Sequence, residues 1–176
     1  MINQKGQAFD VFKLLIAAVI AIAILSLLMP IIGTITGIFT KDPTVEARTL
    51  LSDLYNKPLT WKETAGVTFS SSNPTMAVAA LVEGTNLSAD QVCLSLGDFA
   101  TAEWEITGSG GTRKIEHSTS TSRLVKIAVE CARDTEDPAQ DVLDDELTSR
   151  IGSATLECDE DGCPGPTCCM VVLRRT

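Results

Sequence analysis

The stretch that decides the fold runs from Leu14 to Gly33 and reads LLIAAVIAIAILSLLMPIIG. Its 20 residues contain no charged side chain, and the part from Leu14 to Leu25 contains no polar one. A helix of that length rises about 30 Å, which matches the hydrocarbon core of a bilayer. We therefore expect a long N-terminal hydrophobic α-helix that inserts into a membrane, with a kink near Pro30 and Gly33.

Two ordinary kinds of export segment share this pattern. A cleaved secretory signal peptide has a shorter apolar core and small residues at its cleavage site, and residues 30–34 offer no clear Ala-x-Ala site. An uncleaved signal anchor fits the length, and Lys5 and Lys13 favour a cytoplasmic N-terminus. Neither kind accounts for Gly6, or for the charges of Asp10 and Lys13 at the threshold of the apolar run, where an unpaired charge is costly.

The residues before the apolar run suggest a third kind. Lys5-Gly6-Gln7, followed three residues later by Asp10 and then by the apolar stretch, resembles the class III signal peptide of archaeal type IV pilin-like proteins. The resemblance covers about residues 4–35. It implies that a membrane protease, the prepilin peptidase, cuts between Gly6 and Gln7 on the cytoplasmic side, where Lys5 supplies the charge of the leader.

The same resemblance implies what happens after cleavage. The apolar helix stays on the mature protein, holds the subunit in the membrane and later packs with its copies in the core of a filament. Asp10 would neutralise the new amine of Gln7 on a neighbouring subunit, where a low dielectric strengthens such a pair. An acid near a helix N-terminus is also favourable on its own, so the position of Asp10 has a local explanation as well.

The chain divides by composition near residue 40. We expect a leader at residues 1–6, a hydrophobic transmembrane or filament-core helix at 7–40, a helical stalk extension at 41–58 and an extracytoplasmic β-rich globular domain at 59–176. Asp42-Pro43 is typical of a helix start, with Asp as N-cap and Pro at the first helical position. That helix should end near Asn56.

The outer domain shows mostly strand patterns. Strands are predicted at residues 67–70, 91–96, 103–107, 112–118 and 124–132, a short helix at 74–83 and a helical turn at 142–150. Residues 154–158 and 168–173 are expected to form a final hairpin. The predicted fold is α+β: a long N-terminal hydrophobic α-helix followed by a small antiparallel β-rich domain stabilised by disulfides.

Six cysteines lie in the outer domain: Cys93, Cys131, Cys158, Cys163, Cys168 and Cys169. An even number in an exported domain predicts disulfides. The first two lie in expected strands and either bridge or stay buried thiols. The last four are expected to form two disulfides that pin the hairpin, and adjacent Cys168 and Cys169 should take different partners because they point to opposite faces. Since no C-x2-C zinc knuckle is present, we predict no metal site and no cofactor.

The remaining features argue against enzymes and nucleic-acid binding. The net charge of −9 and the lack of a basic cluster exclude nucleic acid as an expected partner. The single histidine, His117, lies in a Ser/Thr-rich segment and is expected at the surface, and no nucleophile, phosphate or zinc-protease motif appears, so no enzyme activity is predicted. Asn86-Leu87-Ser88 is a candidate N-glycosylation sequon.

These observations predict a structural subunit of an extracellular type IV pilus-like filament, present in the membrane before assembly and then at the cell surface. Its expected partners are its own copies, the prepilin peptidase, the pilus assembly machinery and the membrane. One alternative is a singly anchored surface protein that never polymerises and whose outer domain binds a ligand or partner. Another is a minor accessory pilin that caps or primes a filament.

Overall fold

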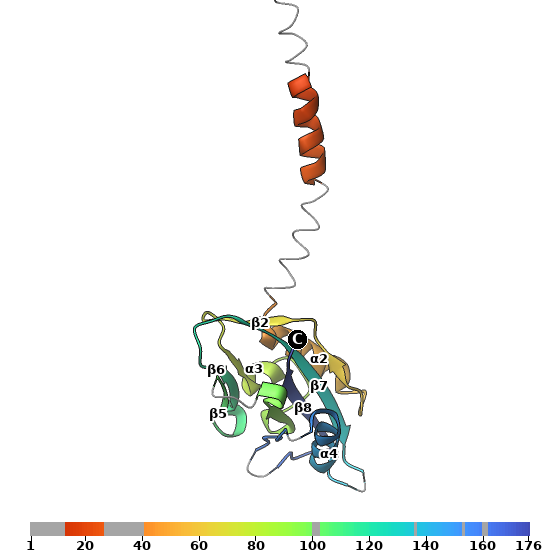
Figure 1. Cartoon of the computed structure of the whole chain (residues 1–176). Coiled ribbons are helices and arrows are strands. Elements are labelled where there is room, and N and C mark those ends of the chain that lie inside the picture. The colour runs from red at the N-terminus through yellow and green to blue at the C-terminus, as the bar shows by residue number, and fades with distance from the viewer. Residues whose placement is uncertain (1–12, 27–40, 100–102, 136, 153, 160–161) are drawn as a thin grey trace, which may run out of the picture. The chain divides into compact units, whose positions relative to one another are not determined.

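The computed structural model describes residues 13–26, 41–99, 103–135, 137–152, 154–159 and 162–176 (Figure 1). The chain forms two compact units, Met1–Ile38 and Phe39–Thr176. The second unit holds three described α-helices, three short 3-10 helices and all of the described strands.

The first unit contains one described helix, at residues 13–26. This corrects the prediction of a long hydrophobic helix over residues 7–40. The described turns rise about 21 Å, which is less than the roughly 30 Å of a bilayer core. No helix within the described residues is both long and apolar enough to cross a membrane. The expected kink at Pro30 and Gly33 falls outside the described residues.

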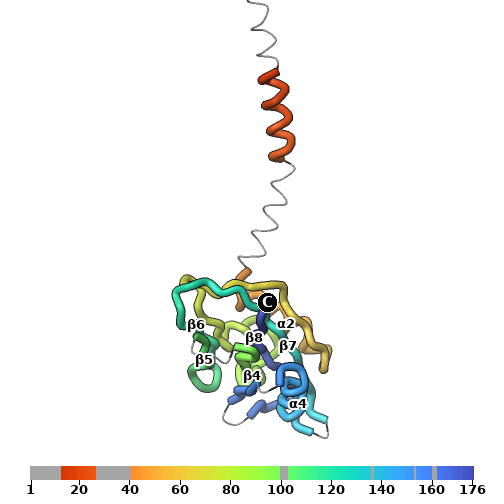
Figure 2. Tube along the Cα trace, in the orientation of Figure 1, coloured from red at the N-terminus to blue at the C-terminus, as the bar shows by residue number. Residues whose placement is uncertain are grey.

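The main sheet of the second unit has five strands. The long strand β7 (Arg123–Arg133) pairs along one side with β1 (Lys62–Glu63) and β2 (Val67–Phe69), and along the other with β8 (Thr167–Arg174). Strand β4 (Val92–Ser95) then pairs with β8, and Figure 2 shows these two strands together beside α4 (Ala139–Ile151).

The pairing of β4 with β8 is parallel, whereas the other pairs of this sheet are antiparallel. The expectation of an antiparallel β-rich domain is therefore wrong for this pair of strands. Parallel neighbours need a long crossover connection, and here the chain between β4 and β8 includes β5 (Trp104–Thr107), β6 (Lys114–His117), β7 and α4. The predicted final hairpin is wrong for the same reason, because β8 takes β7 and β4 as partners.

The remaining described strands form a smaller antiparallel sheet. Its order is β3 (Thr75–Ala77), β6 (Lys114–His117) and β5 (Trp104–Thr107). The helix predicted at residues 74–83 is only partly present, because β3 occupies its first half and the five-residue α3 (Val78–Val82) its second.

The main sheet separates two apolar cores. Side chains of α2 (Pro43–Leu54), α3, the small sheet and one face of β7 and β8 form the larger core. Side chains of α4 and the other face of β4, β7 and β8 form the smaller one. Because successive strand residues point to opposite faces, every residue of β8 from Thr167 to Leu173 is buried. The predicted α+β character and the disulfides of this domain are confirmed.

Local signals set the start of α2. The Asp42 carboxylate accepts hydrogen bonds from the backbone N–H of Thr44, at 2.8 Å, and of Val45, and Pro43 occupies the first helical position. This is the cap predicted from the sequence. Ala47, Leu51 and Leu54 then recur at helical spacing and are fully buried against the larger core.

Candidate functional site

All six cysteines form disulfides. Cys93 bonds to Cys158, Cys131 to Cys169, and Cys163 to Cys168. Neither alternative expected for Cys93 and Cys131 is found: they do not bridge each other, because β8 lies between their strands, and neither is a free thiol. Of the two disulfides expected within the last four cysteines, only one forms. Cys168 and Cys169 take different partners, as their opposite orientations predict.

The sheet divides the disulfides between its two faces. Cys131 and Cys169 are directly opposite each other on β7 and β8, and both lie in the larger core. Cys93 and Cys168 lie in the smaller core under α4, with Cys158 and Cys163 packed against it. Four of the six sulfur atoms therefore gather on one face of the sheet.

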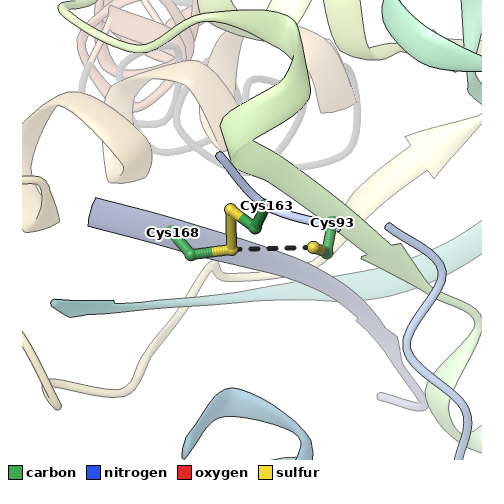
Figure 3. A group of neighbouring side chains, drawn as sticks. All are labelled: Cys93, Cys163 and Cys168. Carbon is green, nitrogen blue, oxygen red and sulfur yellow. Dashed lines mark hydrogen bonds between the residues drawn. A yellow bond between two sulfur atoms is a disulfide. The ribbon is translucent and has the colours of Figure 1, made fainter. Parts of the chain in front are cut away.

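The four-cysteine cluster is compact. The Sγ atoms of Cys93 and Cys168, which are not bonded to each other, lie 3.6 Å apart (Figure 3). The Sγ atoms of Cys93, Cys163 and Cys168 all lie within 4.8 Å of one another, and the Cys158 sulfur is bonded directly to that of Cys93. We call Cys93, Cys158, Cys163 and Cys168 the four-sulfur cluster.

Hydrogen bonds hold the loop that carries Cys158. Glu157 forms a two-way backbone bridge with Leu94 of β4, with N···O distances of 2.8 and 2.9 Å. The Asp159 carboxylate accepts a hydrogen bond from the backbone N–H of Gly110 at 3.1 Å. The position of Cys158 is thus set by polar contacts on both of its neighbours in sequence.

Arg113 joins three segments around the same loop. Its buried guanidinium donates to the carbonyl oxygens of Gly110 at 3.0 Å, Glu157 at 2.9 Å and Ala89 at 3.2 Å. Burial lowers the pKa of Arg113, while Asp159 acts in the opposite direction. Arg113 was not predicted from the sequence, because it stands beside Lys114 in a polar segment that resembles a solvent-exposed one.

A buried acid lies on the α4 face of the sheet. Glu130 on β7 is fully buried, and burial raises the pKa of its carboxyl, while the nearby Arg150 guanidinium lowers it. Arg150 lies 3.5 Å from the Glu130 carboxylate and 5.0 Å over the ring of Trp61. Neither carboxylate oxygen of Glu130 has a hydrogen bond among the described residues.

His117 is buried, contrary to the surface position expected for it. Its ring lies 4.5 Å from that of Trp104, which also contacts Phe69 and Phe99. Alternation along β6 turns His117 inward, although its neighbours in sequence are polar. Burial is the main cause that lowers the pKa of His117.

A Thr–His contact exists at this position. The Nε2 atom of His117 lies 2.9 Å from the Thr119 hydroxyl, but Nδ1 has no hydrogen-bond partner among the described residues. A nucleophile–base pair is normally completed by a third group that orients the base. The described residues therefore supply two parts of such an arrangement and lack the third.

The predicted processing residues lie outside the described part of the chain: Lys5, Gly6, Gln7 and Asp10. Asn86 is described, and its side chain is exposed in the loop after α3, as is Ser88 at the third position of the sequon. An exposed loop is the setting that a glycosylation sequon requires.

The apolar helix at residues 13–26 is exposed throughout. Its large apolar side chains are between 42% and 72% exposed, and they are Leu14, Leu15, Ile16, Val19, Ile20, Ile22, Ile24 and Leu25. These positions lie on every side of a helix rather than on one face. Comparisons with protein-family models, curated proteins and solved structures find no match for this chain.

Proposed function

We propose that this chain is a structural subunit of an extracellular type IV pilus-like filament. In this proposal the apolar residues 14–39 hold the chain in a membrane, and prepilin peptidase removes residues 1–6. Copies then assemble through the apolar segment, and the disulfide-linked domain faces outward. The proposal rests on the resemblance of the first residues together with one structural observation.

That observation is the exposure of the helix at residues 13–26 on all sides. Apolar side chains without a polar face are found where lipid or other apolar helices surround them. Within the helix the small residues Ala17, Ala18, Ala21 and Ala23 alternate with larger ones, and small residues allow close approach of helix backbones. Lipid would cover the apolar surface of this helix before assembly, and the helices of other copies would cover it in the filament.

The outer domain has features that suit an extracellular location. Two of its three disulfides join segments that are distant in sequence, and the third closes a short loop. Disulfides persist in oxidising compartments. Its surface ion pairs, such as Arg123 with Glu103 at 3.0 Å, are exposed and of the kind that keeps a surface soluble. Such a domain suits the outer face of a filament.

The test is to recover the protein from native membranes and from sheared surface material, and to determine its N-terminal residue and its intact mass without reduction. A chain that begins at Gln7 and enters the sheared filament fraction supports the proposal. A chain that begins at Met1 overturns it and leaves the singly anchored surface protein. Cleavage at Gln7 without abundant filaments favours the minor accessory pilin.

Variants separate processing from assembly. Gly6→Val should leave the chain starting at Met1, whereas Asn3→Val in the same leader should still be cut. Asp10→Ala should be cut but absent from the filament fraction. Ser26→Ala is its matched control, because the described hydrogen bond of Ser26 goes to Ala23 of its own helix, and this variant should assemble normally.

A further inference from the structure

We propose that the reduced form of the outer domain binds one zinc ion through the four-sulfur cluster, Cys93, Cys158, Cys163 and Cys168. The two disulfides of the cluster and the metal site are then alternative states of the same four side chains. This inference does not depend on whether the chain forms filaments.

The spacing of the sulfur atoms suits a tetrahedral metal site. With Zn–S bonds of about 2.3 Å, the edge of a tetrahedron of thiolates is about 3.8 Å. The non-bonded Sγ atoms of Cys93 and Cys168 already lie 3.6 Å apart. The sulfur of Cys163 lies within 4.8 Å of both. Three of the four ligand atoms are thus already close together, and the Cys158 side chain, whose sulfur is bonded to that of Cys93, must rotate to reach the same ion.

The frame around the cluster does not depend on its sulfur bonds. Cys93 and Cys168 are placed by the parallel pairing of β4 and β8, in which Cys93 is opposite Met170. The Gln91 amide also donates to the Thr167 carbonyl at 3.0 Å, next to Cys168. Since none of these contacts involves a sulfur bond, we expect Cys93 and Cys168 to stay close together when the disulfides open.

The loops that carry the other two ligands are held in a similar way. The Glu157 bridge to Leu94 and the hydrogen bond from Arg113 fix the residue before Cys158. The Gly162 N–H donates to the Asp159 carbonyl at 2.9 Å, which closes the turn just before Cys163. A site whose ligands are held before the metal arrives loses less conformational entropy on binding.

The ligand spacing and burial also fit. Four residues separate Cys158 from Cys163 and four separate Cys163 from Cys168, which lies within the two to four residues usual between paired zinc thiolates. Cys93 and Cys168 are fully buried, while Cys158 and Cys163 are half-buried. The half-buried pair leaves an approach for both a reductant and a metal ion.

The chemistry balances as two steps. A phosphine reductant and one water molecule convert each disulfide into two thiols, and the phosphine leaves as its oxide. Four thiols then lose four protons to solvent as four zinc–thiolate bonds form, and zinc keeps its oxidation state. Because thiolates are the ligands, the disulfide form has no ligand to offer.

The third disulfide provides a control within the same chain. Cys131 and Cys169 lie in the larger core on the opposite face of the sheet from the cluster. They cannot reach the same ion without turning β7 and β8 over. Removing this pair should therefore leave zinc binding by the folded domain intact.

The experiment uses the full chain in detergent, reduced with a phosphine under inert gas, with zinc binding measured by competition with a chromophoric chelator. About one equivalent should bind to the reduced chain and none to the oxidised chain. Cobalt(II) should give the visible bands of a tetrahedral tetrathiolate site. The Cys163→Ser variant should bind zinc more than about 100-fold more weakly, because losing even an outer-shell partner costs 10–100-fold.

The controls exclude binding by an unfolded chain. Near-ultraviolet circular dichroism monitors the fold, and if reduction loosens the domain, zinc should restore the signal in the wild type but not in Cys163→Ser. The Cys131→Ala/Cys169→Ala variant should behave like the wild type. Equal loss of affinity in this control, full affinity in Cys163→Ser, or less than one equivalent on the reduced folded chain would overturn the proposal.

Discussion

The fully buried carboxylate of Glu130 on β7 lies 3.5 Å from the guanidinium of Arg150 on α4. Arg150 also pairs with Glu146 one helical turn earlier, at 3.1 Å. The Glu130–Arg150 contact links the only described helix on this face to the centre of the main sheet. Because burial disfavours the charged form of Glu130, its ionised state depends on this partner.

We expect Arg150→Ala to lower the free energy of unfolding at pH 7 by about 2 kcal/mol. Breaking a buried pair costs about 3–5 kcal/mol, and the partial exposure of Arg150 reduces this value. In a Glu130→Gln background, the same Arg150→Ala change should cost less than about 1 kcal/mol. Urea unfolding of the four proteins measures the difference, and equal costs in both backgrounds would rule out a role for the pair.

The stability of the domain should also depend on pH through His117, whose pKa is lowered by burial, whereas that of Glu130 is raised. The pKa of His117 is lowered in the folded state, so the unfolded chain binds more protons as the pH falls below the ordinary value of 6.5. The stabilisation is present above that value and is lost as the pH falls through the folded pKa. The loss from one such group is at most about 1.4 kcal/mol per pH unit.

The variant His117→Phe keeps an aromatic ring beside Trp104 and removes the titrating group. Its unfolding free energy should therefore fall less between pH 7.5 and pH 5 than that of the wild type, by urea unfolding at each pH. The comparison is between slopes, since the carboxylates contribute equally to both proteins. Parallel slopes would show that His117 does not titrate differently in the folded state.

Local structure was predicted best where short-range chemistry decides it. Asp42 caps α2 as expected, and the strands near Cys93, Trp104 and Leu124 are confirmed within a residue or two. Helix α4 is longer than the turn expected at 142–150. These features depend on residues that are close in sequence, and the local sequence pattern therefore predicts them.

Features that depend on distant partners were not predictable in this way. The parallel pairing of β4 with β8 brings Cys93 next to Cys168, and no local pattern states which strand becomes a neighbour. The inward position of His117 was not predicted, because the polar residues around it in sequence are typical of an exposed segment. The four-residue spacings around Cys163 were a usable signal for the cluster, but only the fold shows that Cys93 joins it.

Arg113 is expected to matter more than any surface arginine. Arg113→Ala removes charge-assisted hydrogen bonds to three carbonyl oxygens on three segments, and each oxygen keeps only its backbone donor. We expect a loss of about 2–3 kcal/mol in the free energy of unfolding. The control Arg123→Ala removes an exposed pair with Glu103 and should cost less than about 1 kcal/mol. Similar costs in both variants would contradict the bridging role of Arg113.

The three disulfides should differ in their contribution to stability according to the length of chain each one closes. The separations are 65 residues for Cys93–Cys158, 38 for Cys131–Cys169 and 5 for Cys163–Cys168. Loop-closure entropy in the unfolded chain then gives about 4, 4 and 2 kcal/mol, with the first slightly larger than the second.

Paired replacement of each disulfide by alanine tests this order by urea unfolding of the otherwise oxidised chain. Loss of Cys163–Cys168 should be the mildest, because few unfolded conformations are excluded by so short a loop. It also leaves Cys93–Cys158 to hold the neighbouring loop to β4. If removing Cys163 and Cys168 destabilised the domain as much as removing Cys93 and Cys158, packing around the four-sulfur cluster, rather than chain entropy, would set the stability of this face.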